Sequence, residues 1–175
     1  MRLSTKGEYA SRAMLELSLH YADGPMHIRD ISAAQDIPER FLEQILLLLK
    51  RTGYLRSKKG PNGGYYLAKA PSRISVAEVI RVMDGPLAPI DCVSVTAHEV
   101  CPRERVCGLK SLWKETRDAI ARILERTTFE DLAERTRAAQ KMDSGETEGD
   151  RRAGGRSGPG RHVGAVPEGS PLQRA

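Results

Sequence analysis

The sequence has 175 residues, enough for one ordinary domain or two very small ones. Hydrophobic residues make up 39% of it, below the usual globular share, and its 16 glycines raise the glycine content, so we expect an ordered part and a disordered part. The net charge of +5 permits a polyanionic partner, although charge alone does not identify one.

Nothing in the sequence predicts a membrane or secreted protein. No run approaches the roughly 18 apolar residues of a membrane span, and Met1 is followed by a mixed polar segment where a signal peptide would be apolar. We therefore expect a cytoplasmic protein with no membrane partner. In that compartment, three clustered cysteines are more often metal ligands or redox thiols than a disulfide framework.

Three short helices are predicted at the start of the chain. The first spans about residues 5–21, with Thr5 and Glu8 at capping-box spacing. The second spans 28–35, and the third spans about 38–52. Apolar residues at helical spacing predict the buried faces, which are Tyr9, Ala13, Met14, Leu17 and Tyr21 in the first helix, Ile28, Ile31 and Ala34 in the second, and Phe41, Leu42, Ile45, Leu46 and Leu49 in the third.

A β-hairpin is predicted after the third helix. Residues 54–59 form the first strand, the glycine-rich segment 60–64 forms a tight loop, and residues 65–68 form the returning strand. Two short helices, a third helix and a hairpin are typical of a winged helix-turn-helix domain. The predicted fold is therefore mainly α, with a small β-hairpin as its wing.

Basic residues near this hairpin make double-stranded DNA the expected partner. Residues 50–59 contain five cations and no acid. The alternative is a solvated basic surface, but the helix-and-hairpin pattern favours DNA. In the third helix, Gln suits adenine, Arg suits guanine and Glu accepts from cytosine. The predicted DNA contacts are Arg2, Ser4, Thr5, Lys6, Glu39, Arg40, Glu43, Gln44, Arg51, Arg56, Lys58, Lys59, Gly60, Pro61, Asn62, Gly63 and Gly64.

The second half of the chain contains a loop and further helices. Ser75 and Glu78 form a capping box for a helix that ends near Met83. A long helix is predicted from Leu109 to Arg126, and another from Phe129 to Ala139. The predicted divisions are a DNA-binding domain at 1–84, a cysteine loop at 85–108, a dimerisation helix region at 109–141 and a disordered tail at 142–175.

All the cysteines lie in the loop, at Cys92, Cys101 and Cys107, with the spacing C-x8-C-x5-C. Three thiolates on one flexible segment can hold an iron–sulfur cluster. A fourth ligand is then needed, and the candidates are His98 and Glu8. The spacing lacks the short knuckles of zinc sites, although zinc with His98 stays an alternative. A metal-free thiol switch is another, because neighbouring arginines favour the thiolate.

Three motifs carry a resemblance to a known family. They are MRLSTKGEYA at residues 1–10, FLEQIL at 41–46 and GPNGGY at 60–65. With them the chain resembles the Rrf-two family of winged-helix regulators, the group of IscR, NsrR and RirA, over about residues 1–141. The resemblance implies a homodimer with crossing C-terminal helices, in which each subunit places a wing and a recognition helix on half of a palindromic operator.

The resemblance also assigns the cysteines. Cys92, Cys101 and Cys107 match the residues that hold a two-iron or four-iron cluster in family members that sense cluster supply, iron, nitric oxide or redox state. The first gap is longer than in IscR and NsrR and comes closer to RirA. Lys110 stands where IscR-like proteins have a histidine. Glu8 stands where NsrR-like proteins supply an acidic ligand from the other subunit, although it also suits the helix cap and an ion pair with Arg12.

The sequence therefore predicts a transcriptional regulator, more specifically a repressor, controlled by an iron–sulfur cluster. The alternatives are a cluster-free thiol-switch regulator and, in a different class, an iron–sulfur carrier or assembly protein that does not bind DNA. An enzyme is not expected, because no paired carboxylates, nucleophile–base pair or phosphate-binding loop stand at convincing spacing.

Overall fold

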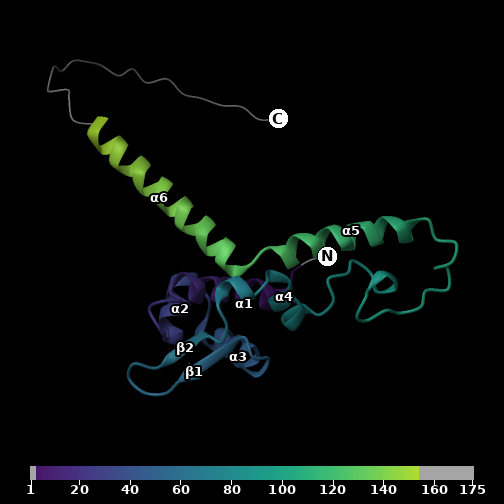
Figure 1. The fold of residues 1–175 in the computed structure, drawn as a ribbon, viewed down its shortest axis with the longest axis horizontal. Helices are drawn as coiled ribbons and strands as arrows, with labels where there is room; N and C mark the ends of the chain where they lie inside the picture. Colours follow the sequence, from purple (N-terminus) through teal and green to yellow (C-terminus); the bar gives the residue numbers. More distant parts are fainter. Residues whose placement is uncertain (1–2, 154–175) are drawn as a thin grey trace, which may run out of the picture. The chain divides into compact units, whose positions relative to one another are not determined.

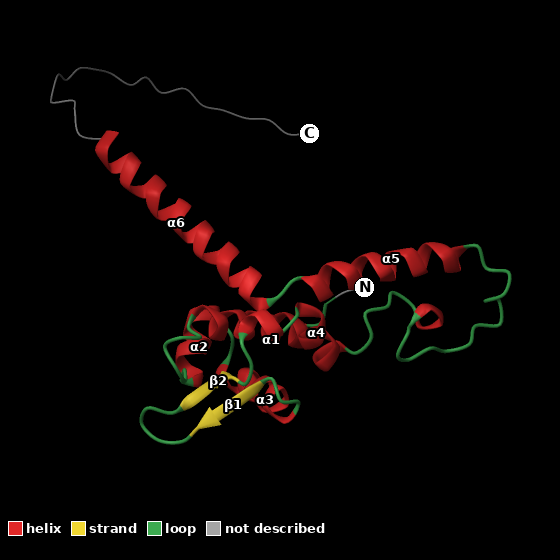
Figure 2. Ribbon diagram, viewed as in Figure 1, coloured by secondary structure: helices red, strands yellow, loops and turns green. Residues whose placement is uncertain are grey.

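The computed structural model describes residues 3–153, and it confirms a mainly helical fold with one small antiparallel sheet (Figures 1 and 2). No helix in this part of the chain is long and apolar enough to cross a membrane. The elements in chain order are α1 (Thr5–Leu19), α2 (Ile28–Gln35), α3 (Glu39–Arg51), β1 (Leu55–Lys58), β2 (Gly64–Leu67), the short 3₁₀ helix η1 (Pro71–Arg73), α4 (Val76–Asp84), a second 3₁₀ helix η2 (Asp91–Val93), α5 (Leu109–Arg126) and α6 (Phe129–Ala153).

The hydrophobic core lies among the first four helices and the hairpin. Helix α1 packs against α2, α3, α4 and β2. Helix α3 supplies an apolar stripe at the spacing of one helix face, and that stripe is buried as predicted. The residues of the stripe are Leu42, Ile45, Leu46 and Leu49. The turn between α2 and α3 passes through Asp36 in the left-handed region, which an aspartate tolerates, and then buries Ile37.

Helix α1 begins at a different cap from the predicted one. The Ser4 side chain accepts a hydrogen bond from the Gly7 backbone N–H at 3.0 Å, so Ser4 is the N-cap. The predicted capping box of Thr5 and Glu8 is therefore wrong. The physical reason is Asp84, whose carboxylate accepts bonds from the Ser4 amide, at 2.9 Å, and from its hydroxyl, and these bonds hold Ser4 at the helix start.

The hairpin is attached to the helical domain by backbone hydrogen bonds. Strands β1 and β2 pair antiparallel, with Leu55 opposite Leu67 and Lys58 opposite Gly64. Met26 and Tyr65 exchange two further backbone bonds, of 2.9 and 2.8 Å, so the chain before α2 flanks β2 on its other side. The wing lies beside α3 (Figure 2).

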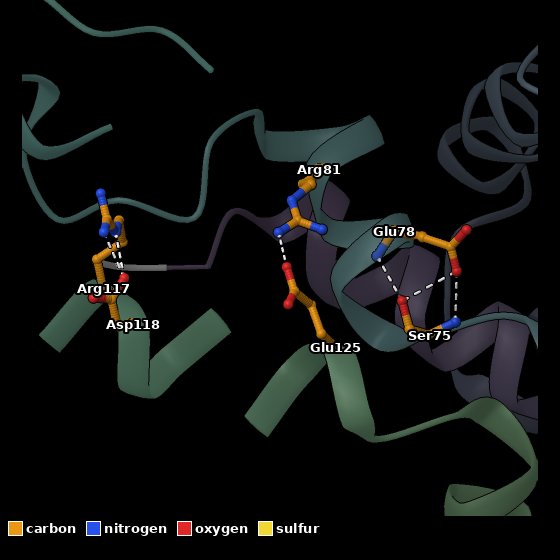
Figure 3. Close-up of polar contacts among 6 residues, drawn as sticks. All are labelled: Ser75, Glu78, Arg81, Arg117, Asp118 and Glu125. Atoms are coloured by element: carbon orange, nitrogen blue, oxygen red, sulfur yellow. Dashed lines mark hydrogen bonds and ion pairs between the residues drawn. The ribbon is translucent and has the colours of Figure 1, made fainter. Parts of the chain in front are cut away.

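Backbone hydrogen bonds link the start of α4 to the residues between α5 and α6. The predicted capping box of Ser75 and Glu78 starts α4 (Figure 3). Next to it, the Val76 amide donates to the Thr127 carbonyl and the Phe129 amide donates to the Ile74 carbonyl, both at 3.0 Å. The Phe129 side chain is fully buried. The start of α6 is therefore part of the same core as α1–α4 and the hairpin.

Three predictions about helix faces and ends need correction. Tyr21 lies past the end of α1 and is 50% exposed, and Ala34 is exposed on α2. Helix α6 continues to Ala153, so residues 142–153 of the predicted tail are helical. Residues 154–175 of that tail lie outside the described residues.

The Gly64→Ala variant is expected to lower the free energy of unfolding by about 1–3 kcal/mol. Gly64 has φ +140°, and an added Cβ would lie 2.1 Å from the Met26 carbonyl oxygen, so the link between wing and Met26 would have to open. Urea unfolding followed by circular dichroism measures the loss. Gly108→Ala is the control, because Gly108 has φ −65° and open space around it. Equal stability of the two variants would contradict this role of Gly64.

Candidate DNA-binding surface and cysteine loop

The outward face of α3 carries the residues predicted to read bases. All four are exposed, while the opposite face of the helix is buried in the core. Burial, and after it the negative charge of Glu43, raises the pKa of Tyr65 in β2. Helix α3 also packs against strand β1, so the outward face of α3 and the wing lie side by side. The four residues are Glu39, Arg40, Glu43 and Gln44.

The predicted wing contacts divide into exposed cations and a structured loop. Arg51, Arg56, Lys58 and Lys59 are exposed, and none of them forms a salt bridge with another residue of the described chain. At the tip, residues 60–62 are exposed. Gly63 is buried and Gly64 half-buried, so these two glycines shape the loop. The Pro61 carbonyl lies 3.0 Å from His27 Nε2, which gives the tip a contact with the start of α2.

The start of α1 brings a third group of predicted DNA contacts to the surface. Thr5 and Lys6 are exposed there. Ser4 is also exposed, but its hydroxyl already binds Asp84 and caps the helix. Arg2 lies outside the described residues. Of the amino-terminal contacts, Thr5 and Lys6 are therefore the ones whose side chains are available to a phosphate.

The three cysteines are free thiols, and each is half-buried. Cys92 belongs to η2, whereas Cys101 and Cys107 lie in irregular segments before α5. Within residues 3–153, no three His, Cys, Asp or Glu side chains lie together as a metal-binding group. The donor set itself suits an iron–sulfur cluster, because three free thiols share one loop. The described loop conformation does not bring them to one point.

One end of the loop is anchored to α5. Val93 and Ser94, directly after Cys92, are buried. The Arg117 side chain, 15% exposed, donates a hydrogen bond to the Val93 carbonyl and pairs with Asp118, with its Nε 2.9 Å from the Asp118 carboxylate (Figure 3). An open cavity of about 300 Å³ lies between this anchor, α4 and the residues that follow α4. The position of Cys92 is therefore tied to the long helix.

The other end of the loop is organised by Glu104. Its Oε1 atom accepts a hydrogen bond from Lys110 Nζ at 2.6 Å and lies 3.2 Å from His98 Nε2. Hydrogen bonds from Lys110 and then from His98 lower the pKa of Glu104. His98, a candidate fourth ligand, is thus engaged with a carboxylate. Glu8, the other candidate, is exposed and pairs with Arg12 at 3.8 Å.

Sequence reasoning missed the contacts that join α4 to α5 and to the start of α1. Arg81 of α4 pairs with Glu125 of α5 (Figure 3), and Asp84 at the end of α4 binds Ser4. These partners are 44 and 80 residues apart in the chain. Spacing in the sequence indicates only contacts between residues a few positions apart. It therefore cannot predict these pairs, whose residue types are also common on protein surfaces.

Comparison with known proteins identifies the family. A family model, Rrf2, described as an iron-dependent transcriptional regulator, matches residues 3–135. The transcriptional regulator CymR of Bacillus subtilis is 35% identical, over 81% of this chain and 96% of its own. The regulator IscR of Photorhabdus laumondii is 39% identical, over 75% of this chain and 79% of its own.

Solved structures agree with this assignment. The structure of B. subtilis CymR, titled the global cysteine regulator of that organism, has a TM-score of 0.66 at 33% identity and covers 77% of this chain and 97% of its own. IscR of T. potens has a TM-score of 0.66 at 30% identity, over 80% and 91%. The family model spans most of the chain, and the curated relatives exceed 30% identity over most of their own length. The chain therefore belongs to the Rrf2 family of DNA-binding transcriptional regulators and is not an enzyme.

Proposed function

We propose that this regulator is a homodimeric repressor that senses iron, nitric oxide or redox state through an iron–sulfur cluster held by Cys92, Cys101 and Cys107. The observation that carries the proposal is the position of the thiols. All three are outside disulfide bonds and half-buried on the segment that joins α4 of the DNA-binding domain to α5. When bound, a cluster supplies iron that reacts with oxygen, nitric oxide or chelators.

The exposed stripe of α5 supports the dimer. Its apolar residues recur at helical spacing, yet none is buried within one chain, and Leu112 and Ile123 are 51% and 65% exposed. An amphipathic helix of this kind is stable when a second copy covers it. A twofold dimer then presents two recognition helices and two wings to a palindromic operator in the cytoplasm. In this proposal residues 109–141 are the dimerisation region and 85–108 the sensor loop.

A chain of contacts gives the loop a route to α4. Cys92 directly precedes Val93, whose carbonyl accepts a hydrogen bond from Arg117 of α5. Two turns later on α5, Glu125 pairs with Arg81 of α4. A change in the loop at Cys92 therefore acts on α5 first and reaches α4 through this ion pair.

The second half of the route runs from α4 to the DNA-binding surface. Asp84, the last residue of α4, binds the backbone and hydroxyl of Ser4. Ser4 in turn caps α1, where Thr5 and Lys6 are exposed. The loop can control DNA binding only if its two states differ in their affinity for DNA. In this proposal, the difference arises from this chain of contacts.

A cluster-free thiol switch is the second candidate. It is favoured by the described loop, in which the three thiols do not lie together as a metal site, and by the similarity to B. subtilis CymR, the global cysteine regulator of that organism. Arg103 and Arg105 beside the cysteines would favour the reactive thiolate. A carrier or assembly protein is set aside, because the family is one of transcriptional regulators.

The first test is anaerobic purification followed by visible absorbance and by iron and sulfide analysis. The wild-type protein is expected to be coloured and to contain both elements, and Cys92→Ser, Cys101→Ser and Cys107→Ser are each expected to lose them, because three thiolates are the minimum protein ligand set. A colourless protein without iron or sulfide after reconstitution would contradict the cluster proposal. A peroxide response that disappears in the serine variants of such a protein would favour the thiol switch.

Glu8 is tested as the ligand from the partner subunit. In Glu8→Ala, faster loss of the cluster to a chelator is expected, because one iron loses its carboxylate. Glu8 also pairs with Arg12, so Arg12→Ala is the matched control that removes the ion pair and keeps the carboxylate. Absorbance decay in chelator measures both. Equal decay in the two variants would mean that Glu8 has only its ion-pair role.

The wing is tested with Lys58→Ala/Lys59→Ala. Both lysines are exposed at the end of β1 and lack acidic partners among the described residues, so this variant is expected to lose retardation of duplex DNA in gel shifts. Cluster content should not change, because neither lysine lies in the sensor loop. Unchanged retardation would remove the wing from the DNA-binding surface.

A further inference from the structure

A basic groove runs between the C-terminal end of α3 and the two wing strands. It has an open volume of about 610 Å³. Its wall includes three cations, Lys50 from α3, Arg56 from β1 and Lys69 just after β2, together with Ser57 and Tyr66, and none of its lining residues is acidic. Lys50 and Lys69 are not among the DNA-binding residues that the sequence predicts.

Interactions within the domain hold the two lysines in place. The Lys50 ammonium donates to the Ser57 hydroxyl at 2.6 Å, which ties α3 to β1. The Lys69 ammonium lies 5.4 Å from the centre of the Tyr54 ring, a cation–π distance. Both side chains thus have a preferred position before any ligand arrives, so binding an anion there costs less side-chain entropy.

Within the described residues, the cations of the groove have no acidic partner. No salt bridge in the described chain includes Lys50, Arg56 or Lys69. Surface lysines and arginines of a stable domain are commonly paired or scattered. Three cations around one hollow without an acid leave an attractive potential for an anion chain.

The position of the groove identifies the anion. A recognition helix in the major groove and a wing tip in the adjacent minor groove straddle one sugar–phosphate strand. The basic groove is lined by the elements that carry those two reading surfaces, α3 and the hairpin. We infer that this groove binds the DNA phosphate backbone between the two reading elements, through Lys50 and Lys69 with Arg56. The inference rests on the proposed binding of α3 and the wing to duplex DNA.

The test uses Lys50→Ala/Lys69→Ala in the full chain and a random-sequence duplex, because phosphate binding does not depend on base sequence. Fluorescence anisotropy measures the dissociation constant over a range of salt concentrations. The slope of log affinity against log salt is expected to become shallower by about 0.9 for each phosphate that the variant no longer binds, and affinity to fall on the order of tenfold at moderate salt. Lys50→Arg/Lys69→Arg keeps the charge and should keep the slope.

Lys114→Ala/Lys141→Ala is the matched control, because it removes two exposed lysines on α5 and α6 and the same net charge. If both alanine pairs leave the same slope as the wild type, or shift it equally, the groove does not hold phosphates. That outcome is separate from failure of the proposed function, in which the wild-type chain itself would not bind duplex DNA. Circular dichroism checks that each variant is folded.

Discussion

The carboxylate of Asp84 fixes the geometry on which the DNA-binding half depends. It lies at the end of α4 and binds the backbone and side chain of Ser4, the residue that starts α1. The close approach requires Gly7, since a Cβ there would lie 2.6 Å from an Asp84 oxygen. Helix α1 packs on the other three helices of the domain core and on β2. Its position therefore sets where α3 and the wing stand, and α4 in turn receives the ion pair from α5.

The local parts of the fold could be predicted from the sequence. The burial of Leu42, Ile45, Leu46 and Leu49 follows from spacing alone, and the capping box of Ser75 needs only a residue three positions away. The cap of α1 could not be predicted in this way. Thr5 and Glu8 have the spacing of a capping box, but Ser4 is the N-cap because Asp84, 80 residues later in the chain, binds it.

In the candidate site, too, the sequence predicts features that depend on local spacing and misses those that depend on distant contacts. Exposure of the α3 residues follows from the buried stripe on the opposite side. In the sensor loop, spacing locates the thiols but not their arrangement, because apolar residues around the thiols, Val95, Val100 and Val106, are exposed and do not fix the path of the loop. The stripe of α5 shows the other limit. Its apolar residues recur at helical spacing, but Leu112 and Ile123 stay exposed in a single chain, while Leu124 packs against the core.

The pairing of the wing has a consequence for how the protein behaves in solution. A strand at the edge of a sheet invites pairing with a strand of another molecule. Strand β2 is protected on its free side by the bonds of Tyr65 to Met26. Strand β1 has no such cover in the described chain, and its sequence is Leu-Arg-Ser-Lys. Its two cations repel a like edge, so the charges that attract DNA also keep unbound molecules from associating through their wings.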